Sequence, residues 1–126
     1  MSEALRGVVV SHGDLARALV EAVAKITGQA DALVPVSNHG CDRSALERRV
    51  AEAVGGVPAV VFVDLPSGSC LLASAQYLHG HDNVACVAGV NLAMLVDFMY
   101  HRETSPDEAA ARALATGGRA IKVIAP

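Results

Sequence analysis

Apolar residues along the chain alternate between short continuous runs and longer stretches with helical spacing. Continuous valine-rich runs, typical of buried parallel strands, cover residues 8–11, 33–36, 59–64 and 84–87. Between and after them, apolar residues recur three or four positions apart, which predicts amphipathic helices over residues 14–26, 42–54, 70–79, 92–100 and 106–116. Residues 121–124 form one more short apolar run and predict a last strand.

Residues with known preferences for helix ends support these boundaries. Gly28 is placed to end the first helix. The second helix has two candidate caps, Asp42 or a capping box that begins at Ser44. Ser105 followed by proline is a strong start for the last helix, and Gly117–Gly118 predicts its end.

Alternating strands and helices predict a three-layer α/β fold. Right-handed crossovers would give an open, mainly parallel sheet of about four strands with helices on both faces. Residues 121–124 are a candidate edge strand or a strand exchanged between subunits. The length of 126 residues favours a single domain over residues 1–126. Aromatic residues are only 3% of the chain, so the core must be built from Ala, Val and Leu.

Composition and charge exclude several function classes. The net charge of −3 and the scarcity of aromatic residues argue against nucleic-acid binding. No apolar run approaches the length of a membrane span, and the opening residues do not resemble a signal peptide. The three cysteines have no CxxC spacing, so we expect reduced thiols in a cytoplasmic protein, no metal site and no cofactor.

The candidate chemistry lies where two predicted strands end. Ser11-His12-Gly13 follows the first strand, and Asp64 ends the third. In doubly wound sheets these strands are commonly neighbours, and ligands bind at their carboxyl ends. Asp64 would then accept a hydrogen bond from one ring nitrogen of His12, leaving the other nitrogen free to act as a nucleophile.

A phosphate site is predicted beside this pair. Ser67, Gly68 and Ser69 directly precede a helix, whose first N–H groups and dipole favour an anion. A histidine nucleophile, an orienting carboxylate and a phosphate cradle together predict phosphoryl transfer through phosphohistidine. Each element also has a structural interpretation: an incidental histidine, a turn-capping aspartate and an ordinary helix start.

These motifs resemble those of the IIA domain of the mannose-family sugar phosphotransferase system, and the resemblance covers nearly the whole chain. The shared motifs are the apolar strand ending in Ser11-His12-Gly13, the strand ending in Asp64 with the loop after it, and the segment 89–95, Gly-Val-Asn-Leu-Ala-Met-Leu. The loop departs from the family pattern, because Ser67 replaces a glycine and Cys70 replaces a proline.

The resemblance implies a phosphoryl carrier. His12 would accept phosphate from the phosphocarrier HPr and pass it to a histidine of a separate IIB protein. Asp64 would orient the ring, and Ser69 would help to hold the phosphate. The resemblance also implies a homodimer in which residues 119–124 exchange between subunits.

Two other functions remain open at this stage. A regulatory module would keep the fold and the phosphorylation but control a protein partner. A receiver domain phosphorylated on Asp64 fits less well, because Ser11-His12 stands where an acidic Mg²⁺-binding pair is needed.

The remaining polar residues have structural interpretations beside functional ones. His39 is expected in a solvated loop. The pair His79 and His81 lies at a helix end and lacks an evident third metal ligand. Cys70 is expected to be a buried passive thiol, with redox sensitivity as the alternative.

Overall fold

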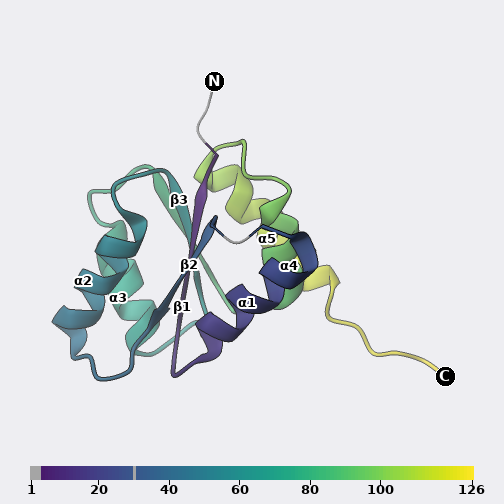
Figure 1. The fold of residues 1–126 in the computed structure, drawn as a ribbon, viewed down its shortest axis with the longest axis horizontal. Coiled ribbons are helices and arrows are strands. Elements are labelled where there is room, and N and C mark those ends of the chain that lie inside the picture. Colours follow the sequence, from purple (N-terminus) through teal and green to yellow (C-terminus); the bar gives the residue numbers. More distant parts are fainter. Residues whose placement is uncertain (1–3, 30) are drawn as a thin grey trace.

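The computed structural model describes residues 4–29 and 31–126, and the predicted alternation of strands and helices is present along them (Figure 1). Each predicted helix or strand boundary moves by at most three residues, and the predicted strand over residues 121–124 is absent from this chain. The elements in chain order are β1 (Arg6–Ser11), α1 (Leu15–Thr27), β2 (Leu33–Ser37), α2 (Arg43–Val54), β3 (Ala59–Val63), α3 (Ser69–Leu78), β4 (Val84–Ala88), α4 (Leu92–Met99) and α5 (Pro106–Arg119).

The four strands form one parallel sheet in the order β2-β1-β3-β4, which confirms the predicted α/β class. Helices α2 and α3 cover one face, and α1, α4 and α5 cover the other (Figure 1). After β1, the chain adds β2 on one side of that strand and then crosses back to add β3 and β4 on the other side. The point where this direction changes lies between β1 and β3, where ligands of such sheets bind.

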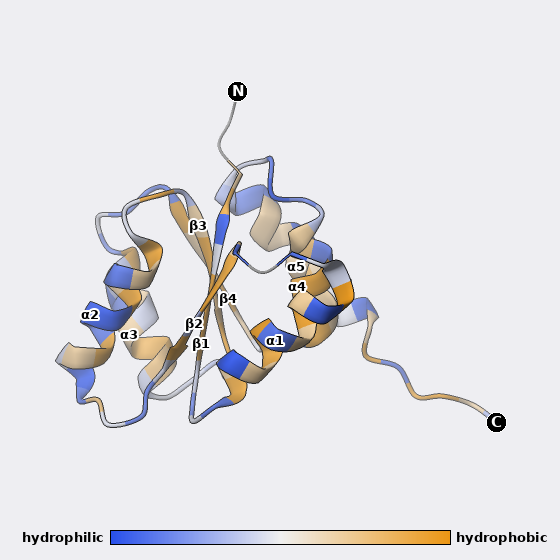
Figure 2. Cartoon of the chain, viewed as in Figure 1, coloured by the Kyte–Doolittle hydropathy of each residue, from blue (hydrophilic) through white to orange (hydrophobic). Residues whose placement is uncertain are grey.

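The core consists of one apolar cluster on each face of the sheet. Alternate residues of β1 divide between them: Val9 packs toward α1 and α4, whereas Val8 and Val10 pack toward α2 and α3. The strands and inner helix surfaces are hydrophobic, and the polar residues lie on the outside of the helices (Figure 2). Phe62 and Phe98 meet edge to face with ring centroids 5.1 Å apart.

Several predicted helix ends are confirmed. Gly28 adopts the left-handed conformation that ends α1. The Asp42 carboxylate accepts from Ala45 N at 2.8 Å, so Asp42 rather than Ser44 caps α2. Ser105 caps α5 as expected.

Two predictions at the C-terminal end are wrong. Helix α5 does not stop at Gly117–Gly118 but continues to Arg119. A side chain at Gly117 would lie 2.5 Å from the Met94 methyl, so this glycine allows close helix packing rather than ending the helix. Residues 121–126 form no strand within this chain; they are exposed and point away from the sheet (Figure 1).

None of the helices described over residues 4–29 and 31–126 combines the length and the apolar composition that a membrane span requires.

Candidate active site

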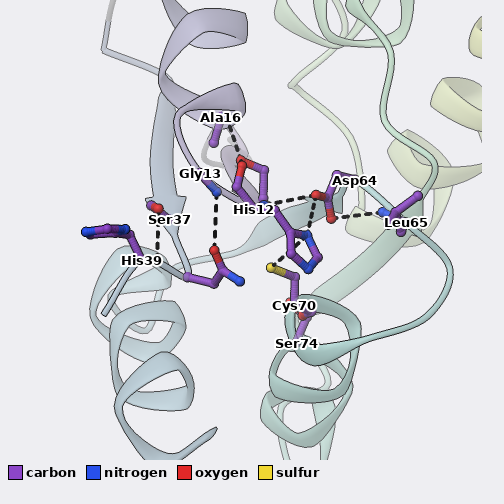
Figure 3. A network of polar contacts seen from close by, with 11 residues as sticks. His12, Gly13, Ala16, Ser37, His39, Asp64, Leu65, Cys70 and Ser74 are labelled. Carbon is purple, nitrogen blue, oxygen red and sulfur yellow. Dashed lines mark hydrogen bonds and ion pairs between the residues drawn. The ribbon is translucent and has the colours of Figure 1, made fainter. Parts of the chain in front are cut away.

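The strand register places His12 and Asp64 side by side at the carboxyl edge of the sheet. Val10 of β1 pairs with Val63 of β3, and the two functional residues follow directly after these strands. The Asp64 N–H donates to the Val10 carbonyl at 3.2 Å, which holds the start of the loop against β1. Figure 3 shows the His12 ring between the Asp64 carboxylate and Cys70.

The contact expected between the two side chains is present. Asp64 Oδ2 lies 2.8 Å from His12 Nδ1 and also accepts from the His12 backbone N–H at 2.9 Å. The other carboxylate oxygen accepts from Leu65 N at 2.9 Å. The Asp64 side chain is only 9% exposed, whereas that of His12 is 46% exposed. The carboxylate is thus fixed beneath a ring that is open to solvent.

The electrostatics of this pair favour an ionised carboxylate. Burial alone would raise the pKa of Asp64. The hydrogen bonds from the His12 N–H and ring, the attraction of the ring and the Leu65 N–H outweigh that effect, and the pKa lies below its ordinary value. An ionised Asp64 can only accept, so it selects the form of His12 with the proton on Nδ1 and the lone pair on Nε2.

Two residues that support the histidine were not predicted to do so. Ser11 is fully buried, and its Oγ accepts from Ala16 N at 2.7 Å, which ties the end of β1 to the start of α1. Asp14 begins the helix without a side-chain cap. The Asn38 side chain accepts from Gly13 N at 3.2 Å. The only signal for Asn38 in the sequence was its position directly after a strand.

The loop after Asp64 approaches the ring through a glycine. Gly68 has φ +90°, and a side chain built on it would come within 4.0 Å of His12 Cε1. Ser67, Gly68 and Ser69 are exposed, and α3 begins at Ser69. The first N–H groups of that helix have no partners within the helix and are therefore open to an anion. The phosphate-binding role of these three residues stays a prediction.

Cys70 is the third side chain at the site. Its sulfur is fully buried and lies 3.8 Å from His12 Nδ1. Burial raises the pKa of the Cys70 thiol to about 11, the Asp64 charge acts in the same direction, and a hydrogen bond with Ser69 opposes both. The thiol is therefore protonated at neutral pH, which agrees with the expected passive character.

The other histidines lie outside this grouping. His39 is exposed in the loop after β2. His81 Nδ1 is 2.6 Å from the Tyr77 carbonyl, and the two rings stack with centroids 4.1 Å apart. His79 and His81 follow the C-terminal end of α3, which is the end of the helix away from His12.

Comparison with known proteins agrees with this geometry. Residues 7–115 match the EIIA-man family, described as the PTS system fructose IIA component. No curated protein matches the chain. Among solved structures, the mannose/sorbose specific IIA subunit of the phosphotransferase system from Enterococcus faecalis is similar, with 26% identity and a TM-score of 0.87 over 98% of this chain and 97% of that one.

Two further solved structures share the fold at lower identity. Phosphotransferase system component EIIA from Streptococcus agalactiae is 17% identical, with a TM-score of 0.87 over 94% of this chain and 96% of that chain. A Klebsiella pneumoniae protein described as a sugar phosphotransferase system permease is 20% identical, with a TM-score of 0.82 over 98% of this chain and 93% of that chain.

Proposed function

This chain belongs to the mannose-type EIIA family of phosphotransferase-system components, and from that premise we propose that it carries phosphate on His12 between HPr and a IIB protein. The observation that carries the proposal is the contact of 2.8 Å between His12 Nδ1 and Asp64 Oδ2. That contact leaves Nε2 as the nitrogen with a lone pair on the exposed side of the pair.

In the proposed reaction, His12 Nε2 attacks the phosphorus of phosphohistidine on HPr. The new N–P bond forms as the bond to the HPr nitrogen breaks, and the electron pair of that bond stays with HPr. The His12 ring becomes more positive as its lone pair is shared. Asp64 stabilises that charge because its Oδ2 already accepts the hydrogen bond from His12 Nδ1–H. Transfer to a IIB histidine is the same step in reverse.

We infer that the loop of Ser67, Gly68 and Ser69 holds the phosphoryl oxygens. Gly68 lies next to His12 Cε1, which adjoins Nε2 in the ring. The N–H groups at the start of α3 and the serine hydroxyls would donate to the oxygens while phosphorus is in transfer. The half-exposed ring suits a reaction in which the donor is a protein.

We also propose a homodimer in which the C-terminal segment pairs with the partner's sheet. Strand β4 is one of the two edge strands of the sheet, and a cleft of about 280 Å³ runs beside it, lined in part by Cys86, Ala88 and Leu114. Val123 is 100% exposed and Ile124 82% exposed, on a segment that points away from its own sheet. An apolar strand from a second copy would cover this edge.

The exchange is tested by measuring the mass of the protein in solution. We expect the full chain to have the mass of a dimer and a chain that ends at residue 120 to have the mass of a monomer. A full chain that sediments as a monomer contradicts the exchange.

The carrier function is tested by incubating the chain with phosphoenolpyruvate, enzyme I and HPr. We expect one acid-labile phosphate per chain, absent from His12→Ala. The matched control His39→Ala should retain it, because this variant removes an exposed histidine that follows the neighbouring strand β2. An unlabelled wild-type chain in the presence of an active donor would refute the function.

The direction of transfer is tested by a chase. Labelled chain is mixed with a IIB protein, and loss of label from His12 to IIB supports the transport role. Charging by HPr without any discharge to IIB would instead favour the regulatory module.

A further inference from the structure

Three different donor atoms converge at the edge of the sheet. His12 Nδ1 is 2.8 Å from Asp64 Oδ2 and 3.8 Å from Cys70 Sγ, and ligand atoms of the three residues all lie within 4.8 Å of one another. They come from the ends of β1 and β3 and from the first turn of α3. The proposed phosphoryl transfer uses the histidine and the aspartate and gives the cysteine no role.

We propose that His12, Asp64 and Cys70 form a binding site for Zn²⁺. The nitrogen, sulfur and carboxylate donors are the ligands that zinc takes, whereas Mg²⁺ and Ca²⁺ prefer oxygen alone. In a tetrahedral zinc site with these bond lengths, neighbouring nitrogen and sulfur ligands are about 3.6 Å apart and nitrogen and oxygen ligands about 3.4 Å. The first spacing is nearly present, and the second requires the His12–Asp64 contact of 2.8 Å to lengthen by about 0.6 Å.

The environment of the three donors fits a metal with an open position. Cys70 is fully buried beneath the ring, while the His12 side chain is 46% exposed. The chain thus supplies three ligands on one side and leaves solvent, or a partner's side chain, on the other. Three protein ligands with an open fourth position is the usual coordination of an accessible zinc ion.

Zinc binding changes the protons at the site in a defined way. The Cys70 thiol loses its proton to solvent when sulfur binds the metal. The Nδ1 proton must also leave when that nitrogen binds, and a neutral ring then carries its proton on Nε2. One proton is released overall, and the imidazole changes tautomer.

The change of tautomer makes metal binding and phosphorylation mutually exclusive, an inference that rests on the proposed function. A zinc-bound His12 has no lone pair on Nε2 to attack phosphorus. A ring phosphorylated on Nε2 keeps its proton on Nδ1, which donates to Asp64, so this nitrogen has no lone pair to bind the metal. Zinc would therefore stop the carrier at the step in which His12 takes up phosphate.

The site is tested with Co²⁺ added to the untagged, reduced chain, because a thiolate bound to Co²⁺ gives a near-ultraviolet charge-transfer band. We expect the band in the wild-type chain at one metal per chain and its loss when Zn²⁺ displaces Co²⁺. Cys70→Ser and Cys70→Ala should both lack the band. The matched control Cys86→Ser, which changes a partly buried thiol in the middle of β4, should keep it.

Two results would overturn the metal site. One is a wild-type chain without the band, and the other is a band that survives in Cys70→Ser. Cobalt bound by the pair His79 and His81 gives no thiolate band, so that binding is distinguished directly. His12→Gln changes an exposed side chain and offers a second folded variant in which the band should be lost.

The exclusion is tested by phosphorylation with and without zinc. At a free zinc concentration of about ten times the Kd, about nine in ten sites are occupied. Because only the zinc-free chain can accept phosphate, the initial rate of labelling should fall about tenfold. Labelling of Cys70→Ser should be the same with and without zinc, which controls for inhibition of the donor proteins. Equal wild-type rates would overturn the exclusion. If no chain is labelled, the proposed function fails, and the cobalt band still decides the metal site.

Discussion

Asp64→Asn replaces the carboxylate beneath the His12 ring with an amide of nearly the same shape. The carboxylate accepts three hydrogen bonds, two on Oδ2 from His12 and one on Oδ1 from Leu65. An amide has one acceptor oxygen and one donor NH₂ group. If the amide oxygen points toward His12, the NH₂ group faces the Leu65 N–H, and two donors oppose each other. If the amide oxygen points toward Leu65, the NH₂ group faces His12 Nδ1 and favours the tautomer with the proton on Nε2.

The expected loss follows from these two orientations and from the missing charge. A positive ring about 4 Å from a carboxylate gains about 4 kcal/mol at an effective dielectric of 20, and the exposure of the ring roughly halves that gain. Loss of the hydrogen bond from His12 Nδ1–H to the charged carboxylate partly overlaps with this electrostatic loss, so it raises the barrier by only about 1 kcal/mol more. A barrier raised by about 3 kcal/mol lowers the rate of phosphoryl acceptance about 150-fold. One unsatisfied N–H lowers the free energy of unfolding by about 1 kcal/mol.

The rate is measured by rapid-quench labelling of each variant with phospho-HPr, and stability is measured by urea unfolding. Asp14→Asn is the matched control, because Asp14 lies two residues from His12 but is exposed and forms an exposed ion pair with Arg17. Its rate should stay within about twofold of wild type, since exposed ion pairs contribute little. A rate for Asp64→Asn within threefold of wild type, in a folded protein, would refute the orienting role. Equal losses in both variants would point to net charge instead.

Three further predictions concern stability and thiol reactivity. Gly68→Ala forces a side chain into a conformation with φ +90° and should lower the free energy of unfolding by about 1–3 kcal/mol, seen as a lower urea midpoint; an unchanged midpoint contradicts the strain. Phe98→Ala removes a fully buried ring and should cost about 3–5 kcal/mol, whereas Tyr100→Ala, at a residue 58% exposed, should cost under about 1 kcal/mol. Burial raises the pKa of Cys86 to about 11 from an ordinary 9.0, so the folded chain keeps this proton to higher pH. Iodoacetamide at pH 8 should therefore modify Cys86 about 100-fold more slowly than an ordinary thiol, with the rate rising up to about pH 11. Mass spectrometry of the alkylated peptides would detect early labelling of Cys86, which would contradict its burial.

The sheet and the His12–Asp64 contact could be predicted from the sequence because both depend on short-range patterns. Valine runs mark buried strands, and the carboxyl ends of neighbouring parallel strands share one edge. The extent of α5 could not be predicted in this way. Two successive glycines usually end a helix, but here Gly117 is retained in it by close packing against Met94, a residue 23 positions earlier. Such contacts depend on where two helices meet in space, which local propensity does not determine.

The segment 121–124 is not a strand within its own chain for a related reason. Its composition suits a strand, but a strand also needs a partner edge, and within one chain α5 directs this segment away from β4. Local sequence thus reports the preference of a segment and not the presence of its partner. Ser11 is a smaller example, since its role depends on the Ala16 N–H that reaches it after the turn at Gly13.

The sequence placed Cys70 in the loop beside the candidate site, but it could not show that the sulfur lies 3.8 Å from His12 Nδ1, and this closeness changes what the edge of the sheet can bind. No ligand spacing connects residues 12, 64 and 70, because three separate elements bring them together. What they bind is decided by the proton on the His12 ring. With the proton on Nδ1, this nitrogen donates to Asp64, and Nε2 would be the nucleophile for phosphorus in the proposed reaction. With Nδ1 bound to a metal, Cys70 and Asp64 complete the coordination and Nε2 carries the proton. A cysteine at this position would therefore couple the proposed carrier to zinc through one tautomeric equilibrium of the His12 ring.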